Sequence, residues 1–292
     1  MTPEEGVALS RFTTLGTGGP ARAFARPETA DEVSELLQWA ASRGMTVAVV
    51  GLGSNLLAAD AGVDALVLKL GGELARVDVD GHVLRAGAGV ANAVCLHRAR
   101  DAGLGGFEFA CAIPGTIGGG IWMNAGAYGS DFSAVLERAL VATVDGSGWL
   151  TPTELGLSYR HSELIHGQVV LQAELRLRPR PSEEIRADVR ELNARRKDAQ
   201  PTNKRTFGSV FKNPAHELSA GRMLDACGLR GYAIGGACIS PKHANFIENA
   251  GGATTADALA LMAEARRRAN EEFGVMLEHE VEFLGGLALP DL

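Results

Sequence analysis

Apolar and polar residues recur with a helical period near the beginning of the chain. Residues 29–32 read Thr-Ala-Asp-Glu, a sequence typical of a capping box at a helix N-terminus. Apolar side chains then follow at positions i, i+3, i+4 and i+7, namely Val33, Leu36, Leu37 and Ala40. Gly44 stands where such a helix would end. The pattern therefore predicts an amphipathic helix that packs one side against a core.

A β-branched apolar run at residues 46–50 predicts a strand that leads directly into the loop Gly51-Leu-Gly53-Ser54-Asn55. A dinucleotide-binding Rossmann turn needs a helix directly after its glycines, but here a second strand is predicted at 66–70. The chain also lacks the Gly-Lys-Ser/Thr sequence of a P-loop. Two interpretations of the loop remain open: a nest of backbone amides that binds phosphate, or a hairpin loop without a ligand.

Further periodic segments extend this mixture of helices and strands. Strands are predicted at 76–79, 82–86, 141–143 and 169–177, and helices at 91–102, 183–198 and 256–273. The last predicted strand, 275–283, alternates: Val275, Leu277, Val281 and Phe283 fall on one face, and Glu278, Glu280 and Glu282 on the other. The Gln200-Pro201 break predicts a domain boundary near residue 200.

Glycine is unusually frequent, because 37 of 292 residues compares with an average usage of about 7%. The densest glycine segment covers residues 113–129. One interpretation is a backbone packed directly against something flat and large, since glycine permits close approach. The alternative is a tight helix contact within the protein.

The formal net charge of −7 gives no general attraction for a phosphate backbone, so nucleic acid is not expected as a partner. Any anionic ligand needs a local basic cluster. One such cluster contains Arg195, Arg196, Lys197, Lys204, Arg205 and Lys212. It represents either an anion site or ordinary solvated surface.

The four cysteines are scattered at positions 95, 111, 227 and 238, without a C-x-x-C pair or a histidine at metal-ligand spacing. We therefore expect reduced, mostly buried thiols and no metal. No apolar run reaches the roughly 18 residues of a membrane span, and no basic and apolar signal begins the chain. These features favour a cytoplasmic protein without membrane insertion.

The stretch Thr206-Phe-Gly-Ser-Val-Phe-Lys-Asn-Pro214 leaves the role of its serine open. Ser209 could be a turn residue at the start of a strand, or a hydroxyl that takes part in chemistry. The stretch by itself does not decide between them.

Five motifs together resemble the UDP-N-acetylenolpyruvoylglucosamine reductase (MurB) family. They are Val50-Gly-Leu-Gly-Ser-Asn-Leu56, Pro114-Gly-Thr-Ile-Gly-Gly through Asn124-Ala-Gly-Ala-Tyr-Gly129, Tyr159-Arg160-His-Ser162, Gly208-Ser209-Val-Phe-Lys-Asn-Pro214 and Leu277-Glu-His-Glu-Val281. The resemblance begins at Leu15-Gly-Thr-Gly-Gly-Pro20 and continues almost to the C-terminus. Each motif is weak by itself, but five in family order are specific.

The resemblance implies an α+β fold: a two-part FAD-binding domain of the vanillyl-alcohol-oxidase (PCMH-like) type, followed by a C-terminal α+β substrate-binding domain. The expected boundaries are 1–70 and 71–199 for the two FAD-binding subdomains and 200–292 for the substrate-binding domain. The FAD-binding residues implied in the two glycine segments are Gly51, Gly53, Ser54, Asn55, Leu56, Pro114, Gly115, Thr116, Gly118, Gly119, Asn124, Ala125, Gly126 and Ala127. Some relatives attach flavin to a histidine in the first loop. Residues 51–55 contain no histidine, so FAD is expected to bind non-covalently.

The implied reaction belongs to peptidoglycan precursor synthesis and uses NADPH to reduce FAD. Hydride from flavin N5 then converts UDP-N-acetylglucosamine enolpyruvate to UDP-N-acetylmuramate. By resemblance, Ser209 donates the proton, while Arg160 and Glu280 position and polarise the substrate carboxylate. Lys197, Lys212 and Asn213 are candidates for binding the phosphates and carboxylate of the nucleotide sugar.

The sequence departs from the family pattern in two places. Only 48 residues separate Arg160 from Ser209, which indicates the shorter group of the family, without the insertion that carries a substrate-binding tyrosine. His161 also stands where the family more often has an acidic residue.

Alternatives to this function remain at the sequence level. Glu280 is selected only by its motif, since an exposed acidic face is the usual meaning of its strand pattern. Another FAD-dependent oxidoreductase acting on a small hydroxy acid would keep both glycine loops. A nucleotide-sugar-binding protein without catalysis is the third possibility, although Arg160, Ser209 and Glu280 occur together.

Overall fold

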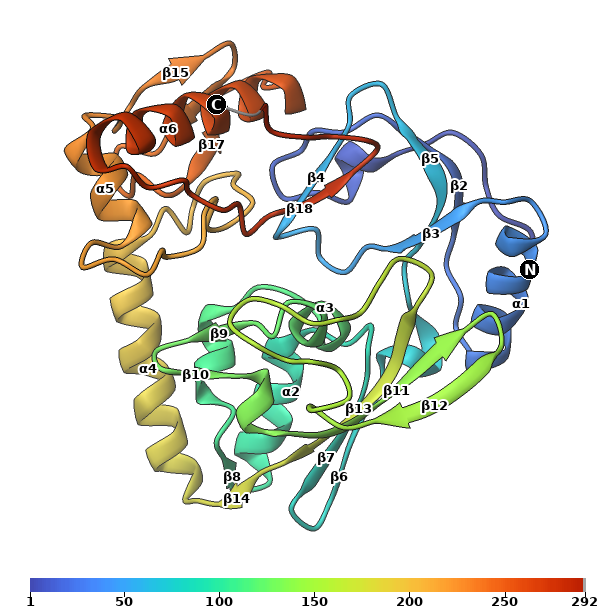
Figure 1. Cartoon of the computed structure of the whole chain (residues 1–292). Coiled ribbons are helices and arrows are strands. Elements are labelled where there is room, and N and C mark those ends of the chain that lie inside the picture. The colour runs from blue at the N-terminus through green and yellow to red at the C-terminus, as the bar shows by residue number, and fades with distance from the viewer. Residues whose placement is uncertain (291–292) are drawn as a thin grey trace. The chain divides into compact units, whose positions relative to one another are not determined.

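A computed structural model describes residues 1–290 of the chain (Figure 1). The chain divides into two compact units. Unit 1 contains residues 1–5, 23–52 and 65–195, and unit 2 contains residues 6–22, 53–64 and 196–292. The three-part division expected from the sequence stays a prediction.

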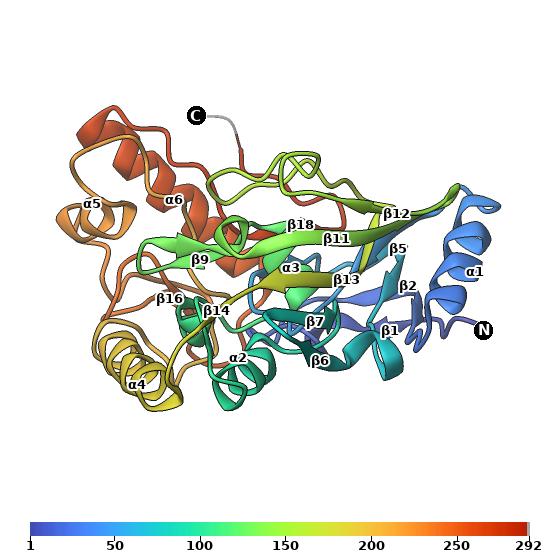
Figure 2. The same cartoon turned by 90° about the horizontal axis from the view of Figure 1, so that it is seen from below.

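Unit 1 contains a five-stranded antiparallel sheet with the strand order β12-β11-β13-β7-β6 (Figures 1 and 2). These strands are β6 (Val77–Asp80), β7 (Val83–Gly87), β11 (Leu136–Thr143), β12 (Gly146–Leu150) and β13 (Val169–Arg176). The two long central strands pair in register at Ala139 and Ala173, and both side chains are fully buried. Along β13, the buried Leu171, Ala173 and Leu175 alternate with the polar residues Gln172 and Glu174.

Other short elements complete unit 1. Its helices are α1 (Ala30–Ala41), α2 (Asn92–Asp101) and α3 (Ile117–Trp122), and α4 (Ser182–Ala199) begins in it. Its 3₁₀ turns are Gly72–Ala75, Glu108–Ala112 and Phe132–Ala134. Strands β8 (Leu104–Gly105) and β14 (Arg178–Pro179) pair with each other, as do β9 (Gly126–Ala127) and β10 (Ser130–Asp131). Strand β3 (Thr46–Val49) runs parallel to β5 (Val63–Leu68) from Thr46 and Ala65 onwards.

Helix α1 confirms the amphipathic helix predicted from the spacing of apolar residues near the start of the sequence. The Thr29 side chain accepts a hydrogen bond from Glu32 N, at 3.2 Å. Glu32 bonds back to Glu28 N at 2.7 Å, one residue before the Thr29 cap. The four predicted apolar side chains are the buried ones of this helix.

The core of unit 1 explains one of the glycines in the dense segment. Phe107, Phe109 and Phe132 form a cluster of edge-to-face rings with centroids 5.4–6.1 Å apart. A Cβ on Gly120, in α3, would lie 2.2 Å from the Phe132 ring. Helix α3 can therefore pack here only because Gly120 has no side chain.

Unit 2 has its own core and a smaller sheet. Its helices are α5 (Ala220–Ala226) and α6 (Thr255–Phe273), preceded by a 3₁₀ turn at Leu9–Arg11. Strands β15 (Ala233–Ile234), β16 (Ala237–Ile239) and β17 (Ile247–Asn249) form a sheet in that order. Strand β4 (Leu56–Ala58) pairs in parallel with β18 (Glu282–Leu284), and β1 (Val7–Ala8) pairs with the start of β2 (Pro20–Ala25).

Two sequence predictions are corrected by the structure. The predicted strand 275–283 is regular only at Glu282–Leu284, with an isolated bridge between His279 and Phe211. A two-residue period therefore identified extended backbone here but not a continuous ladder. The thiols are also less buried than expected, because only Cys95 is fully buried. Burial raises the pKa of Cys95 to about 12, so this thiol is unreactive.

Candidate functional site

In unit 1, the two glycine segments meet at Gly51. This residue follows the end of β3, and a Cβ on it would lie 2.6 Å from Thr116 Oγ1. Thr116 caps α3 by accepting a hydrogen bond from Gly119 N at 3.4 Å. The beginning of the first segment and the second segment, far apart in the sequence, are therefore in contact in unit 1.

The glycines of α3 have different surroundings, which separates the two interpretations of the dense segment. Cβ atoms on Gly118 and Gly120 would lie 3.0 Å from Ala88 and 2.2 Å from Phe132, so protein packing explains both glycines. A Cβ on Gly119 would meet only Thr116 Oγ1, at 3.6 Å. Gly119 is exposed, and within residues 1–290 no protein contact explains its lack of a side chain, so a ligand can approach it closely.

Three residues of unit 1 carry backbone strain. Asn124, Tyr128 and Arg160 have φ angles of +38°, +54° and +53°, and they are the non-glycine residues with positive φ in the described part of the chain. Such conformations cost of order 1–3 kcal/mol each and gather at functional sites. All three fall in motifs that the sequence singled out.

Direct contacts hold the strained segments together. Arg160 donates a hydrogen bond to Gly126 O at 2.6 Å, and Asn124 Nδ2 donates to Ser158 O at 2.9 Å. Ser162 Oγ donates to Trp122 O at 2.6 Å. Because Ser158 and His161 form a tight bridge, Tyr159 and Arg160 occupy the turn between them. His161, which stands where the family more often has an acidic residue, is therefore part of this bridge and follows Arg160 directly.

The remaining predicted FAD-binding residues of unit 1 support the same segment. Gly115 O accepts a hydrogen bond from Asn92 N at 3.0 Å, and Ala125 N donates to Gly120 O at 2.8 Å. Pro114 is exposed before the cap at Thr116. Gly126 and Ala127 form strand β9, where a Cβ on Gly126 would lie 2.5 Å from Ser130 O.

In unit 2, Gly53 is required by close packing. Its φ is +66°, and a Cβ on it would lie 1.8 Å from Phe12 O. Thr14 donates its backbone N–H to Gly53 O at 3.0 Å, and its hydroxyl to Thr206 O at 2.6 Å. Thr14 thus connects the glycine loop to the stretch that contains Ser209.

The stretch around Ser209 is braced on two sides. Val210 N donates to Asn245 O at 2.9 Å, and Glu280 N donates to Val210 O at 2.8 Å. Asn55 Nδ2 donates to Glu280 O at 3.0 Å. The structure therefore brings Asn55, Ser209 and Glu280 into one region of unit 2, while Arg160 belongs to unit 1.

Ser209 itself is half-buried between residues with fixed backbones. Gly208 has a φ of +83°, and a Cβ on it would lie 3.2 Å from Ser54 O. Within residues 1–290, no protein group shares a hydrogen bond with Ser209 Oγ. The hydroxyl is therefore available to a ligand.

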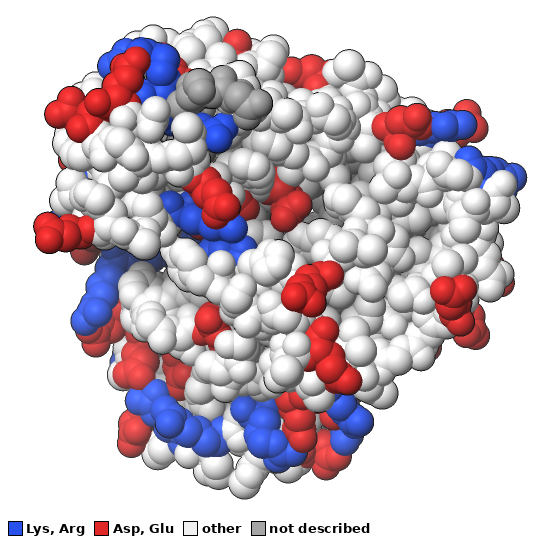
Figure 3. Space-filling model, viewed as in Figure 1, with Lys and Arg blue, Asp and Glu red and all other residues white. Residues whose placement is uncertain are grey.

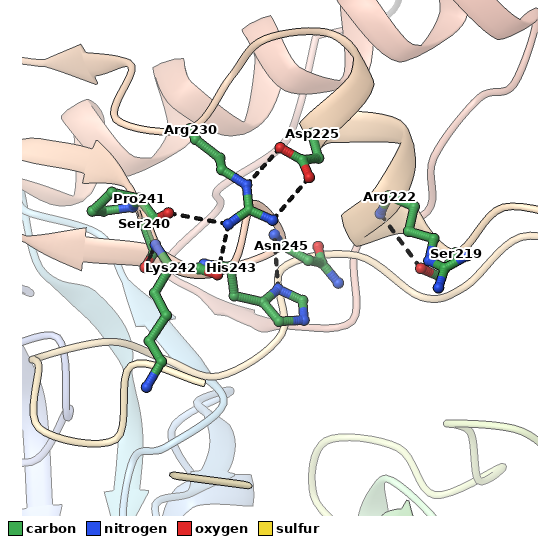
Figure 4. Close-up of polar contacts among 9 residues, drawn as sticks. All are labelled: Ser219, Arg222, Asp225, Arg230, Ser240, Pro241, Lys242, His243 and Asn245. Atoms are coloured by element: carbon green, nitrogen blue, oxygen red, sulfur yellow. Dashed lines mark hydrogen bonds and ion pairs between the residues drawn. The ribbon is translucent and has the colours of Figure 1, made fainter. Parts of the chain in front are cut away.

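A polar cluster that includes Arg230 and His243 contacts Asn245 (Figure 4). Arg230 binds Asp225 through its guanidinium fork and donates to the carbonyls of Pro241 and Lys242 at 3.1 and 2.9 Å. His243 Nδ1 accepts from Asn245 N at 3.2 Å. Burial lowers the pKa of His243, and Arg230 lowers that pKa further, which favours a neutral ring.

The three predicted substrate-binding residues differ in their surroundings. Lys212 is half-buried and forms an ion pair with Glu278 at 3.3 Å. Asn213 Oδ1 accepts from Ala220 N at 3.1 Å, at the start of α5. Lys197 is exposed near the end of α4, and its carbonyl accepts a hydrogen bond from Lys242.

Sequence reasoning missed two residues that organise this region. Asn245 is buried, and its side chain donates to Phe211 O at 2.8 Å and accepts from Phe211 N at 3.0 Å. An amide residue inside the apolar run Ala244–Ile247 was the available signal, because buried polar groups need partners. Thr14 lies one residue before the motif at 15–20 and gave no signal.

Basic and acidic residues are interspersed on the face shown in Figure 3. No helix within residues 1–290 combines the length and the apolar character needed to cross a membrane. In the same residues, no three histidine, cysteine, aspartate or glutamate side chains are grouped so that they could hold a metal ion.

Two protein families match consecutive parts of the chain. The FAD binding domain matches residues 21–149, and the C-terminal domain of UDP-N-acetylenolpyruvoylglucosamine reductase matches residues 200–284. The chain is thus a FAD-dependent oxidoreductase. The predicted fold class, with its FAD-binding domain and C-terminal α+β domain, is confirmed.

Relatives along nearly the whole length define the family. The chain is 43% identical to UDP-N-acetylenolpyruvoylglucosamine reductase 2 of Symbiobacterium thermophilum, over 95% of this chain and 90% of the relative. It is 44% identical to the Anaeromyxobacter dehalogenans reductase, over 95% of this chain and 84% of that relative. The crystal structure of the Thermus caldophilus enzyme (MurB) matches with a TM-score of 0.85 at 39% identity, covering 97% of this chain and 99% of that one. This chain belongs to the UDP-N-acetylenolpyruvoylglucosamine reductase family, which confirms the resemblance and the expectation of FAD.

Proposed function

We propose that this protein reduces UDP-N-acetylglucosamine enolpyruvate to UDP-N-acetylmuramate, with bound FAD and with NADPH as reductant. The observation that carries this proposal is the braced serine: Ser209 has an available hydroxyl, and the next residue is bonded to Glu280 N. This arrangement occurs in a chain that matches members of the reductase family over 95–97% of its length. The four free thiols accord with a reducing compartment such as the cytoplasm.

The residues present fit FAD. Gly119 is exposed, and within residues 1–290 no protein side chain or backbone requires a glycine there, while Gly51 contacts Thr116 of the second segment. Residues 51–55 and 114–127 would hold the cofactor through backbone amides and small side chains. When bound, FAD supplies the hydride for the terminal alkene carbon of the substrate.

Ser209 supplies the proton that completes the reduction. The alkene carbon beside the carboxylate gains negative charge as the other carbon is reduced, so it needs a proton from the protein. Ser209 Oγ donates this proton as a general acid. The bonds of Val210 to Asn245 and to Glu280 N fix the backbone next to the hydroxyl.

Arg160 and Glu280 act on the substrate carboxylate, where negative charge accumulates. The planar guanidinium of Arg160 can bind both oxygens of a carboxylate, and its strained turn limits the directions in which the side chain can point. Glu280 is half-buried and carries a backbone contact to Asn55. Lys212 and Asn213 would bind the nucleotide part of the substrate, together with Lys197.

We expect the purified protein to be yellow and to release its flavin when it is denatured with acid. Residues 51–55 contain no histidine to which FAD could be linked. The absorbance of the supernatant and of the washed pellet measures the two fractions. Flavin that stays with the pellet would show a covalent link and contradict this expectation.

Replacement of two neighbouring glutamates should give different results. The Glu278 side chain is 78% exposed and pairs with Lys212, whereas Glu280 is half-buried and its backbone bonds to Val210 and Asn55. Glu280→Gln should lower turnover by ~10²-fold, as expected for loss of a charged group at a reaction centre. Glu278→Gln should change turnover by no more than ~3-fold, because the Glu278 carboxylate is exposed and water screens its charge.

Anaerobic absorbance spectra provide the measurement for both variants. NADPH should bleach the flavin in both variants. The enolpyruvyl substrate should then restore the flavin colour quickly in Glu278→Gln and slowly in Glu280→Gln. Equal losses of turnover in the two variants would show that the family motif does not identify Glu280 as the glutamate that serves the reaction. Wild-type flavin that is bleached by NADPH but never recovers with this substrate would refute the proposed function.

A further inference from the structure

Lys69 lies beside the first glycine loop because of the register of two parallel strands. Strand β5 ends at Leu68, which pairs with Val49 at the end of β3, and Val50 N donates to Leu68 O at 2.8 Å. The next residues on the two strands are therefore neighbours. Lys69 Nζ donates a hydrogen bond to Gly51 O, at 2.7 Å.

The environment of Lys69 disfavours its positive charge. Lys69 is half-buried. Burial lowers the pKa of its ammonium group, and repulsion from Arg26 lowers that pKa further. A lysine at a strand end can ordinarily extend into water. Instead, Lys69 is held against Gly51 O by its hydrogen bond.

The contact determines where the next amide points. In a trans peptide the carbonyl of one residue and the N–H of the following residue point in opposite directions. Gly51 O is directed at Lys69, so the Leu52 N–H points away from it. Within residues 1–290, no protein acceptor is assigned to this N–H, and Leu52 is 44% exposed.

We propose that Lys69 is a positioning residue for FAD: it holds the Gly51–Leu52 peptide so that the Leu52 N–H binds a phosphate oxygen of the cofactor. Its ammonium group also places a positive charge next to the two negative phosphates. Thr116 packs against Gly51 from the other segment, because its Oγ1 lies 2.6 Å from the position that a Cβ of Gly51 would take. This inference rests on the proposed binding of FAD to residues 51–55.

The test is the affinity of the apoprotein for FAD, measured by quenching of flavin fluorescence. Lys69→Met should bind FAD roughly tenfold more weakly or worse, the scale of one charge-assisted hydrogen bond. Lys69→Arg keeps the charge and a donor, so it should recover most of the affinity. The matched control is Arg76→Met, which removes an equal charge from an exposed ion pair of the same unit and should leave the affinity within ~2-fold of wild type.

Salt and thermal unfolding distinguish positioning from a structural role. The difference between wild type and Lys69→Met should narrow as ionic strength rises, because salt screens the charge on Lys69. The inference is overturned if Lys69→Met binds FAD as wild type does. It is also overturned if both Lys69 variants lose affinity equally and their apoproteins unfold at lower temperature. A wild-type apoprotein that does not bind FAD would instead refute the proposed function on which the inference rests.

Discussion

Ser209→Ala should bind FAD normally and accept electrons from NADPH at nearly the wild-type rate. Neither step requires the hydroxyl, and a serine-to-alanine change removes one atom from a half-buried site. Transfer to the enolpyruvyl substrate should slow by at least ~10²-fold, the usual effect of losing a general acid. Stopped-flow absorbance measures the two half-reactions separately.

The surroundings of Ser209 make this a specific test. The brace on Val210 uses backbone groups and Asn245, so the alanine variant keeps the stretch in place. Ser219→Ala is a suitable control, because that serine only caps α5 through Arg222 N. If the second half-reaction of Ser209→Ala stayed within a few-fold of wild type, Ser209 would be a turn residue and another group would donate the proton.

Gly53→Ala should destabilise the protein strongly. A Cβ at this position would lie 1.8 Å from Phe12 O and 2.8 Å from Thr13 Cα, and both neighbours are backbone atoms that cannot rotate away. The left-handed φ of +66° adds about 1–2 kcal/mol for a residue with a side chain. This conformational cost and the overpacking together should lower the free energy of unfolding by about 2–5 kcal/mol. Urea unfolding followed by circular dichroism measures this loss.

Gly274→Ala provides the matched control within the same unit. Gly274 ends helix α6 with a φ of +64°, and a Cβ on it would have no neighbouring atom within 4 Å. Its replacement should therefore cost only the conformational part, about 1–2 kcal/mol. Equal effects of the two substitutions would show that close packing at Phe12 does not explain Gly53.

Local patterns in the sequence were sufficient for the regular elements. The cap at Thr29 and the spacing of Val33, Leu36 and Leu37 depend only on contacts within one turn or on one buried face, so helix α1 was predicted almost to the residue. Helix α6 likewise begins after Thr254 and ends at Gly274. Such signals are contained in a few neighbouring residues.

Contacts between distant segments could not be predicted in this way. The glycine at position 120 is explained by a ring twelve residues later, and Gly53 by a carbonyl forty-one residues earlier. The pattern of alternating glutamates predicted extended backbone at 278–282, but it gave no preference for Glu280. The family motif singled out Glu280, and in the structure its backbone is contacted by Asn55 and Val210, which come from other parts of the chain.

The division of the chain into interleaved units has a consequence for its synthesis. The core of unit 2 combines Leu15 and Leu57 with residues from Phe207 to Val281, so its contacts span most of the sequence. Such a core has a high contact order, and its nucleus must close very long loops. During translation, residues 6–22 and 53–64 leave the ribosome long before their partners exist, while the segments of unit 1 are already complete at residue 195. Unit 1 is therefore the part of the nascent chain that can fold first, and the exposed apolar side chains of the early unit 2 segments need protection from aggregation until the last helix has emerged.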